Sequence, residues 1–177
     1  MRTWAHQERW GRGGVWRVVM VFWLLAVGAC GEGEPLSVPS EEEVEARYEF
    51  HGPVEVSISG NVAQVTVQVF PDEIERGGPL WARSLPYLFL FSEGTRELFQ
   101  EHSGLAGVRL IARDPDGAPI SRALLERGAL TPAGWDRALN IAGRARTEGT
   151  ESPARVRDLV RWGEDHTEFE YNPRYEP

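Results

Sequence analysis

The sequence contains no lysine and a single cysteine in 177 residues, and both shortages restrict the chemistry open to the protein. All 19 basic residues are arginine, so the phosphate-binding loop that ends in Gly-Lys is excluded. One cysteine allows neither an intrachain disulfide nor a zinc site of paired cysteines. The four histidines are far apart in the sequence and form no pair at metal-ligand spacing. We therefore expect no metal, no cofactor and a fold that depends on a packed core.

Signatures of catalysis and of nucleic-acid binding are also missing. The string Gly-x-Ser-x-Gly, which places a nucleophilic serine on a sharp turn, does not occur. Acidic residues outnumber basic ones by 27 to 19, which gives a net charge of -8. No stretch is basic enough to neutralise a run of phosphates, on which nucleic-acid affinity mostly depends. The sequence therefore favours no particular enzyme class and argues against a nucleic-acid partner.

The first thirty residues have the layout of an export signal. Four arginines before residue 18 give a positive flank, the apolar run at residues 18–27 follows, and small residues come next. This three-part order is typical of a secretory signal peptide. The run has about ten residues, whereas a helix needs roughly 20 to span a bilayer. We therefore expect a removable leader rather than a permanent membrane span.

The leader ends in Val27-Gly28-Ala29-Cys30, which resembles the lipobox of bacterial lipoprotein precursors: an aliphatic residue, two small residues and then cysteine. The resemblance covers the export segment alone, and valine stands where leucine is usual. It implies that Cys30 carries acyl chains of the palmitate type and that Ala29 is the last residue removed. Two or three chains would hold the protein on a membrane essentially permanently. The alternative is that Cys30 is a buried thiol at the end of an ordinary anchor.

The resemblance also implies a cellular location. Gly31, rather than aspartate, follows the cysteine, and under the enterobacterial sorting pattern this implies the outer membrane rather than the inner one. Removal of the leader would take away four arginines and one glutamate, so the remaining chain would be more acidic than the whole. Anionic headgroups repel such a chain. We therefore expect acyl chains on Cys30 to hold the protein at the cell envelope, facing the periplasm.

Composition divides the chain into a leader, a linker and one domain. Residues 1–29 are the predicted signal peptide, and residues 30–40 are the lipidated cysteine with a flexible tether rich in Gly, Pro and Glu. Residues 41–177 are predicted to form a single α+β domain. We expect a small antiparallel sheet packed against a kinked hydrophobic helix and two C-terminal helices.

Strands are predicted where apolar residues alternate with polar ones. Residues 54–70 alternate on both sides of Gly60-Asn61, which is typical of an antiparallel hairpin. A second alternation at residues 108–112 ends at residues 114–117, Asp-Pro-Asp-Gly. We interpret this as a tight turn rather than a calcium loop, because no third Asp or Asn and no bidentate Glu follow at the required positions. Residues 46–50 also alternate, although Ser40 followed by three glutamates is equally typical of a helix start.

Helices are predicted from apolar spacing and from their start signals. Residues 79–102 have helical spacing, but Pro86 requires either a kink or two helices separated near residues 92–94. A buried strand at residues 85–91 is the competing interpretation. Thr131-Pro132 and Ser152-Pro153 each place a capping hydroxyl before a proline at the first helical position, so two further helices are expected to begin there. Alternating aromatic residues in the tail then predict a short closing strand.

Aromatic side chains provide the candidate contact surface. Trp162 lies at the border of the apolar face of the last predicted helix, and Phe169, Tyr171 and Tyr175 follow in the tail. Aromatic residues at the border of a polar surface often anchor partners. We therefore predict that Trp162, Tyr171 and Tyr175 contact an envelope protein partner.

These observations lead to a membrane-anchored envelope lipoprotein that acts as a non-catalytic binding or accessory module. Two alternatives stay open. One is a small envelope hydrolase that uses carboxylates or a histidine such as His102 or His166. The other is a periplasmic carrier of small ligands, which requires a large enclosed apolar pocket beneath residues 85–91.

Overall fold

The computed structural model describes residues 36–175, except for the side chains of residues 71–76 and 175. The predicted signal peptide, the lipobox and Cys30 lie outside the described residues, as does the side chain of Tyr175. Within the described part, none of the helices combines the length and the apolar character needed to cross a bilayer.

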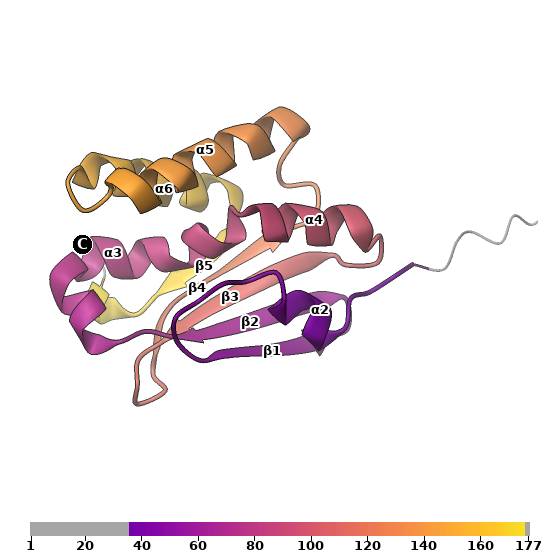
Figure 1. The fold of residues 1–177 in the computed structure, drawn as a ribbon, viewed down its shortest axis with the longest axis horizontal. Coiled ribbons are helices and arrows are strands. Elements are labelled where there is room, and N and C mark those ends of the chain that lie inside the picture. The colour runs from indigo at the N-terminus through magenta and orange to yellow at the C-terminus, as the bar shows by residue number, and fades with distance from the viewer. Residues whose placement is uncertain (1–35, 176–177) are drawn as a thin grey trace, which may run out of the picture. The chain divides into compact units, whose positions relative to one another are not determined.

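One five-stranded sheet organises the domain (Figure 1). Its strands lie side by side in chain order: β1 (Val54–Ser59), β2 (Val62–Gln68), β3 (Gly107–Arg113), β4 (Pro119–Glu126) and β5 (Glu168–Tyr171). Neighbouring strands are antiparallel except for β2 and β3, which run parallel. A parallel pair needs a long crossover, and two helices supply it here. The predicted α+β class is confirmed, and the sheet is mixed rather than wholly antiparallel.

The helices form two further layers on one face of this sheet. They are α2 (Glu41–Glu45), α3 (Pro71–Leu90), α4 (Glu93–Glu101), α5 (Pro132–Glu148) and α6 (Pro153–His166), followed by the short 3-10 helix η1 (Pro173–Tyr175). Helix α3 packs on β3 and β4 with one side and on α5 and α6 with the other (Figure 1). A helix covered on two sides must be apolar over most of its circumference. This position explains why residues 79–91 form the most hydrophobic stretch of the described chain.

The long hydrophobic segment is two helices, as one of the two sequence interpretations expected. Helix α3 ends at Leu90, and the Ser92 hydroxyl accepts a hydrogen bond from the Thr95 backbone N–H at 3.3 Å to start α4. The alternative of a buried strand at residues 85–91 is therefore wrong. Helix α3 also begins at Pro71, earlier than predicted, and bends at Gly78, whose φ of 63° is outside the helical region.

The chain before the sheet is helical and packed against the domain. Ser40 and Glu43 cap α2 reciprocally, with Glu43 N–H donating to the Ser40 hydroxyl at 3.2 Å. The helix interpretation is thus confirmed over a strand at residues 46–50. The Gly104 backbone N–H donates to the Ser37 carbonyl at 2.7 Å, and Pro39 is buried. Residues 37–40, predicted as flexible tether, therefore belong to the folded domain.

Local signals set most of the remaining elements, with two exceptions. The Thr131 hydroxyl caps α5 by accepting from Gly134 N–H at 3.1 Å, whereas Ser152 makes no capping hydrogen bond although α6 begins after it. Asp114 closes the β3–β4 turn by accepting from Ala118 N–H at 2.8 Å, which supports the turn over a calcium loop. Strand β4 itself was not predicted.

Candidate functional site

The predicted contact residue Trp162 is half-buried among its neighbours. Its indole stacks on the His166 ring with 4.0 Å between centroids, and the Arg137 guanidinium lies 4.5 Å from the indole centroid. The His166 Nδ1 atom also lies 2.8 Å from the Trp162 carbonyl oxygen. Much of the Trp162 surface is therefore already used within the domain.

Tyr171 is buried, with 9% of its surface exposed, so it cannot offer the exposed contact that the sequence predicted. Its hydroxyl donates to the Glu164 carboxylate at 3.0 Å and accepts from the Tyr87 hydroxyl at 2.6 Å. Arg83 completes the cluster through an ion pair with Glu164. Burial, and next the Tyr87 hydroxyl, raise the pKa of Tyr171 above its usual value. These four groups join α3, α6 and β5 and have a structural role, while Phe169 beside them is 44% exposed.

His102 and His166, the candidate histidines of the hydrolase alternative, contact different residues. His102 ends α4, and its carbonyl accepts a hydrogen bond from Arg127. His166 contacts Trp162, as described above. Neither histidine hydrogen-bonds to a carboxylate of the described residues. Over the same part of the chain, no group of three or more His, Cys, Asp and Glu side chains is placed to hold a metal ion.

The largest cavity that adjoins α3 lies between this helix and the segment at residues 46–51, and it has a volume of about 860 Å³. The segment at residues 46–51 forms one wall, α3 and the start of α4 form the floor, and Arg146 of α5 contributes from the other wall. Half of the fourteen lining residues are apolar or carry a Phe, Tyr or Trp ring: Ala46, Tyr48, Phe50, Trp81, Leu85, Leu88 and Phe89. The rest include the charged residues Arg47, Glu49, Glu97 and Arg146. Cavities of roughly 300–1,000 Å³ are typical of small-ligand sites.

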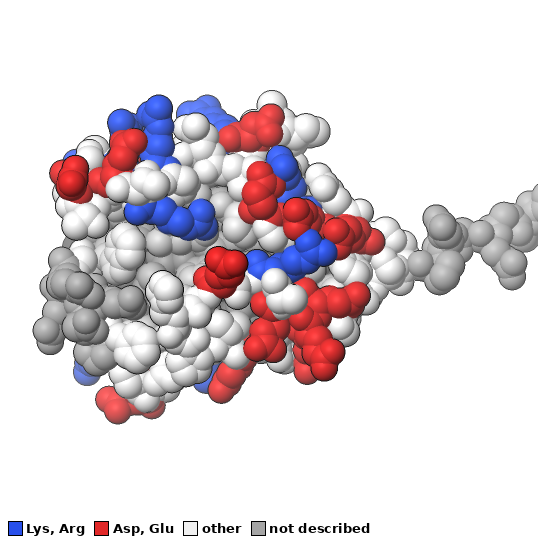
Figure 2. Space-filling view, viewed as in Figure 1, with Lys and Arg blue, Asp and Glu red and all other residues white. Residues whose placement is uncertain are grey.

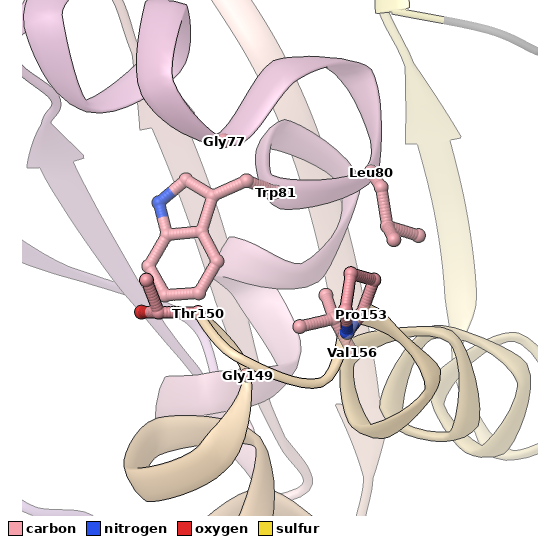
Figure 3. Close-up of a pocket in the computed structure, with 7 residues that line it drawn as sticks. All are labelled: Gly77, Leu80, Trp81, Gly149, Thr150, Pro153 and Val156. Carbon is pink, nitrogen blue, oxygen red and sulfur yellow. The ribbon is translucent and has the colours of Figure 1, made fainter.

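A second cavity of about 360 Å³ lies between the first part of α3 and the turn that joins α5 to α6 (Figure 3). Leu80 points toward Pro153 and Val156 in this view, and Trp81 points toward Thr150. Trp81 lines both cavities. We therefore treat the two as one site, the α3 groove, which follows α3 from Gly77 to Leu90 and ends at Ser92. At 1.5 Å per residue this stretch is about 20 Å long.

Arg146 is the distinctive charged residue of the α3 groove. Its guanidinium donates one hydrogen bond to the Leu88 carbonyl in the last turn of α3. No carboxylate of the described residues lies within ion-pair distance of it. Arg146 is exposed as a residue, although the partial burial of its side chain against α3 lowers the pKa of the guanidinium from its usual value. The wall arginine Arg47, by contrast, is neutralised by Glu97 and Glu101.

Acidic residues dominate one end of the molecule. Figure 2 shows acidic side chains gathered at the end formed by α2 and α4, where the described chain begins, while arginines and acidic side chains are mixed over α5 and α6. Arg146 therefore lies in a region of mixed charge in a protein that is acidic as a whole.

Comparison with known proteins identifies no relative. No protein-family model matches the chain, and no curated protein or solved structure matches it significantly. The class of the protein is therefore defined by its own features: an α+β domain with a partly apolar groove whose Arg146 has no carboxylate partner among the described residues.

Proposed function

We propose that the protein is a membrane-anchored, non-catalytic binding module of the cell envelope, and that the α3 groove is its binding site. The proposed binding function rests on one observation. The α3 groove is large enough for a small ligand, and its Arg146 has no carboxylate partner among the described residues. The anchor rests on the resemblance of residues 27–30 to a lipobox. The carrier alternative uses the same groove, although residues 85–91 line an open groove on the outer side of α3 rather than roof an enclosed pocket.

The anchor is tested by Cys30→Ser. Because the thiol is the predicted attachment point, this variant is expected to incorporate no labelled palmitate and to keep its leader, and both are measured by metabolic labelling and intact mass. A matched control adds Ser37→Cys to the Cys30→Ser chain, which restores a thiol outside the lipobox and should not restore labelling. A Cys30→Ser protein that is cut and labelled like the wild type would exclude lipidation at Cys30.

The groove is tested by photo-crosslinking in the native envelope. A photoreactive residue replaces Phe89, which is half-buried in the floor of the α3 groove. We expect an adduct from this position, detected as a gel shift for a protein or as an added mass for a small molecule. The control replaces Ser57, an exposed residue of β1, and should give no adduct. Equal yields from both positions, or none from position 89, would show that the α3 groove is not the binding site.

A further inference from the structure

We propose that the α3 groove binds a long-chain fatty acid, with the carboxylate at Arg146 and the hydrocarbon chain along the apolar lining beside Trp81 and Leu88. This inference rests on the proposed function and adds the chemical class of its ligand.

The hydrogen-bond donors of Arg146 indicate that the head group of the ligand is a carboxylate. A guanidinium has five N–H donors in one plane, and only one hydrogen bond, to the Leu88 carbonyl, is made within the described residues. Two parallel N–H groups match the two oxygens of a carboxylate, which makes this pairing stronger and more directional than a neutral contact. Arg146 is exposed to solvent, so a bound carboxylate would lie at the rim of the groove rather than inside it. A carboxylate would thus satisfy the cation that the fold leaves without a partner.

The charge of the walls limits the head group to a single negative charge. Glu97 lies in the wall and is matched by Arg47, and Glu49 lies in the same wall as a further carboxylate. A doubly charged phosphate monoester would meet these carboxylates, while Arg146 is the lining arginine that is not already paired with a described carboxylate. The α3 groove therefore fits a monoanion better than a phosphate monoester.

The floor of the α3 groove indicates that the ligand has an aliphatic tail. Along Leu85, Leu88 and Phe89 the floor is the side of a helix, whose backbone groups are paired within the helix or, at the Leu88 and Phe89 carbonyls, with side chains. An extended peptide needs backbone partners along its length and would find few of them here. A hydrocarbon chain needs none and gains from each methylene that it buries. The floor therefore selects an aliphatic chain.

Arg146 also has a structural function, because a cation at the C-terminal end of α3 stabilises the last carbonyls of that helix. A test must separate this function from ligand binding. Arg146→Lys keeps the positive charge and a donor for the Leu88 carbonyl, whereas Arg146→Gln removes the charge. Arg144→Gln is a matched control, because Arg144 is exposed on the same helix, like Arg146, but lies outside the lining.

The experiment uses the full lipidated chain in phospholipid nanodiscs and a palmitate that carries a photoreactive diazirine. We expect the probe to label the α3 groove, as mapped by mass spectrometry of peptides from residues 77–92. Labelling should fall at least fivefold in Arg146→Gln, largely persist in Arg146→Lys and stay within twofold of wild type in Arg144→Gln. Unlabelled palmitate should compete at concentrations where hexadecanol does not, and octanoate should compete less well than palmitate.

Equal labelling of wild type and Arg146→Gln, or equal competition by palmitate and hexadecanol, would overturn the inference. The competition series uses the wild-type chain, so it decides the question even if Arg146→Gln fails to fold. A groove adduct from position 89 in the native envelope without palmitate labelling would refute the ligand class and leave the proposed function standing. Absence of both signals would refute the function itself.

Discussion

Replacing Gly163 by alanine is expected to destabilise the domain by about 3 kcal/mol. Gly163 is buried in α6 and faces Tyr87 of α3, and a Cβ atom there would overlap the Cγ, Cδ1 and Cε1 atoms of the tyrosine ring. The ring has no room to retreat, because Tyr87 is fully buried and its hydroxyl is bonded to Tyr171. Helices α3 and α6 would have to separate. The measurement is thermal and denaturant unfolding, with a fall in the melting temperature of roughly 10 °C.

Gly143→Ala is the matched control for this substitution. Gly143 lies inside α5, and a Cβ atom at this position would meet no heavy atom within 4 Å. Alanine favours a helix interior over glycine by about 1 kcal/mol, so this variant should be slightly more stable than the wild type. If both variants shifted stability in the same direction, close packing of α6 on Tyr87 would not be what requires glycine at position 163.

Above pH 10 the protein is expected to lose stability because Tyr48, Tyr87 and Tyr171 are buried as neutral phenols. Burial raises the pKa of Tyr87 from 10.0 to about 12, and burial also raises the pKa of Tyr48 and of Tyr171. A phenol with a raised pKa binds its proton more tightly in the folded state than in the unfolded state. The contribution of such a phenol to the free energy of unfolding is complete below pH 10, and for Tyr87 it is lost as the pH rises through 12. For Tyr87 alone the loss is about 3 kcal/mol.

The composition makes this alkaline transition easy to assign. The chain has no lysine, whose amine titrates near pH 10 in other proteins, and its arginines stay charged well above that pH. Tyrosinate absorbance and circular dichroism, recorded together against pH, should therefore change in one coincident transition. In Tyr87→Phe the stability should fall less steeply above pH 10 than in the wild type. Tyrosinate absorbance from Tyr48, Tyr87 and Tyr171 that appeared near pH 10 while the circular dichroism stayed native would contradict the expectation.

The elements predicted correctly are those that short stretches of sequence determine. The β1–β2 hairpin follows from strict alternation around Gly60, whose φ of 62° suits a tight turn. Helix α5 begins where a threonine hydroxyl precedes a proline. Strand β4 was missed because its sequence PISRALLE is rich in helix formers and both Ile120 and Ser121 are buried. It is a strand because β3 and β5 pair with it on both sides, which no local pattern reveals.

The candidate site could not be predicted because its parts are distant in the sequence. Residues 46–51, the outer side of α3 and Arg146 are brought together only when α5 and the segment before β1 pack around α3. The spacing of Trp81 and Leu85 predicted an apolar helix face correctly, but apolar spacing does not tell whether such a face is fully covered. Tyr171 failed as a contact for a similar reason. A strand of four residues shows alternation without showing which face is buried.

The attachment of residues 37–39 to the domain determines how the α3 groove would meet its ligand. Only the chain between Cys30 and Leu36 remains as a spacer, and its full extension is about 20 Å. With Cys30 acylated as proposed, the domain is confined to a thin layer at the bilayer surface. A fatty acid dissolved in that bilayer would reach the protein by diffusion in two dimensions, within the plane that holds the anchor. The α3 groove would then meet its ligand at the membrane surface rather than in free solution.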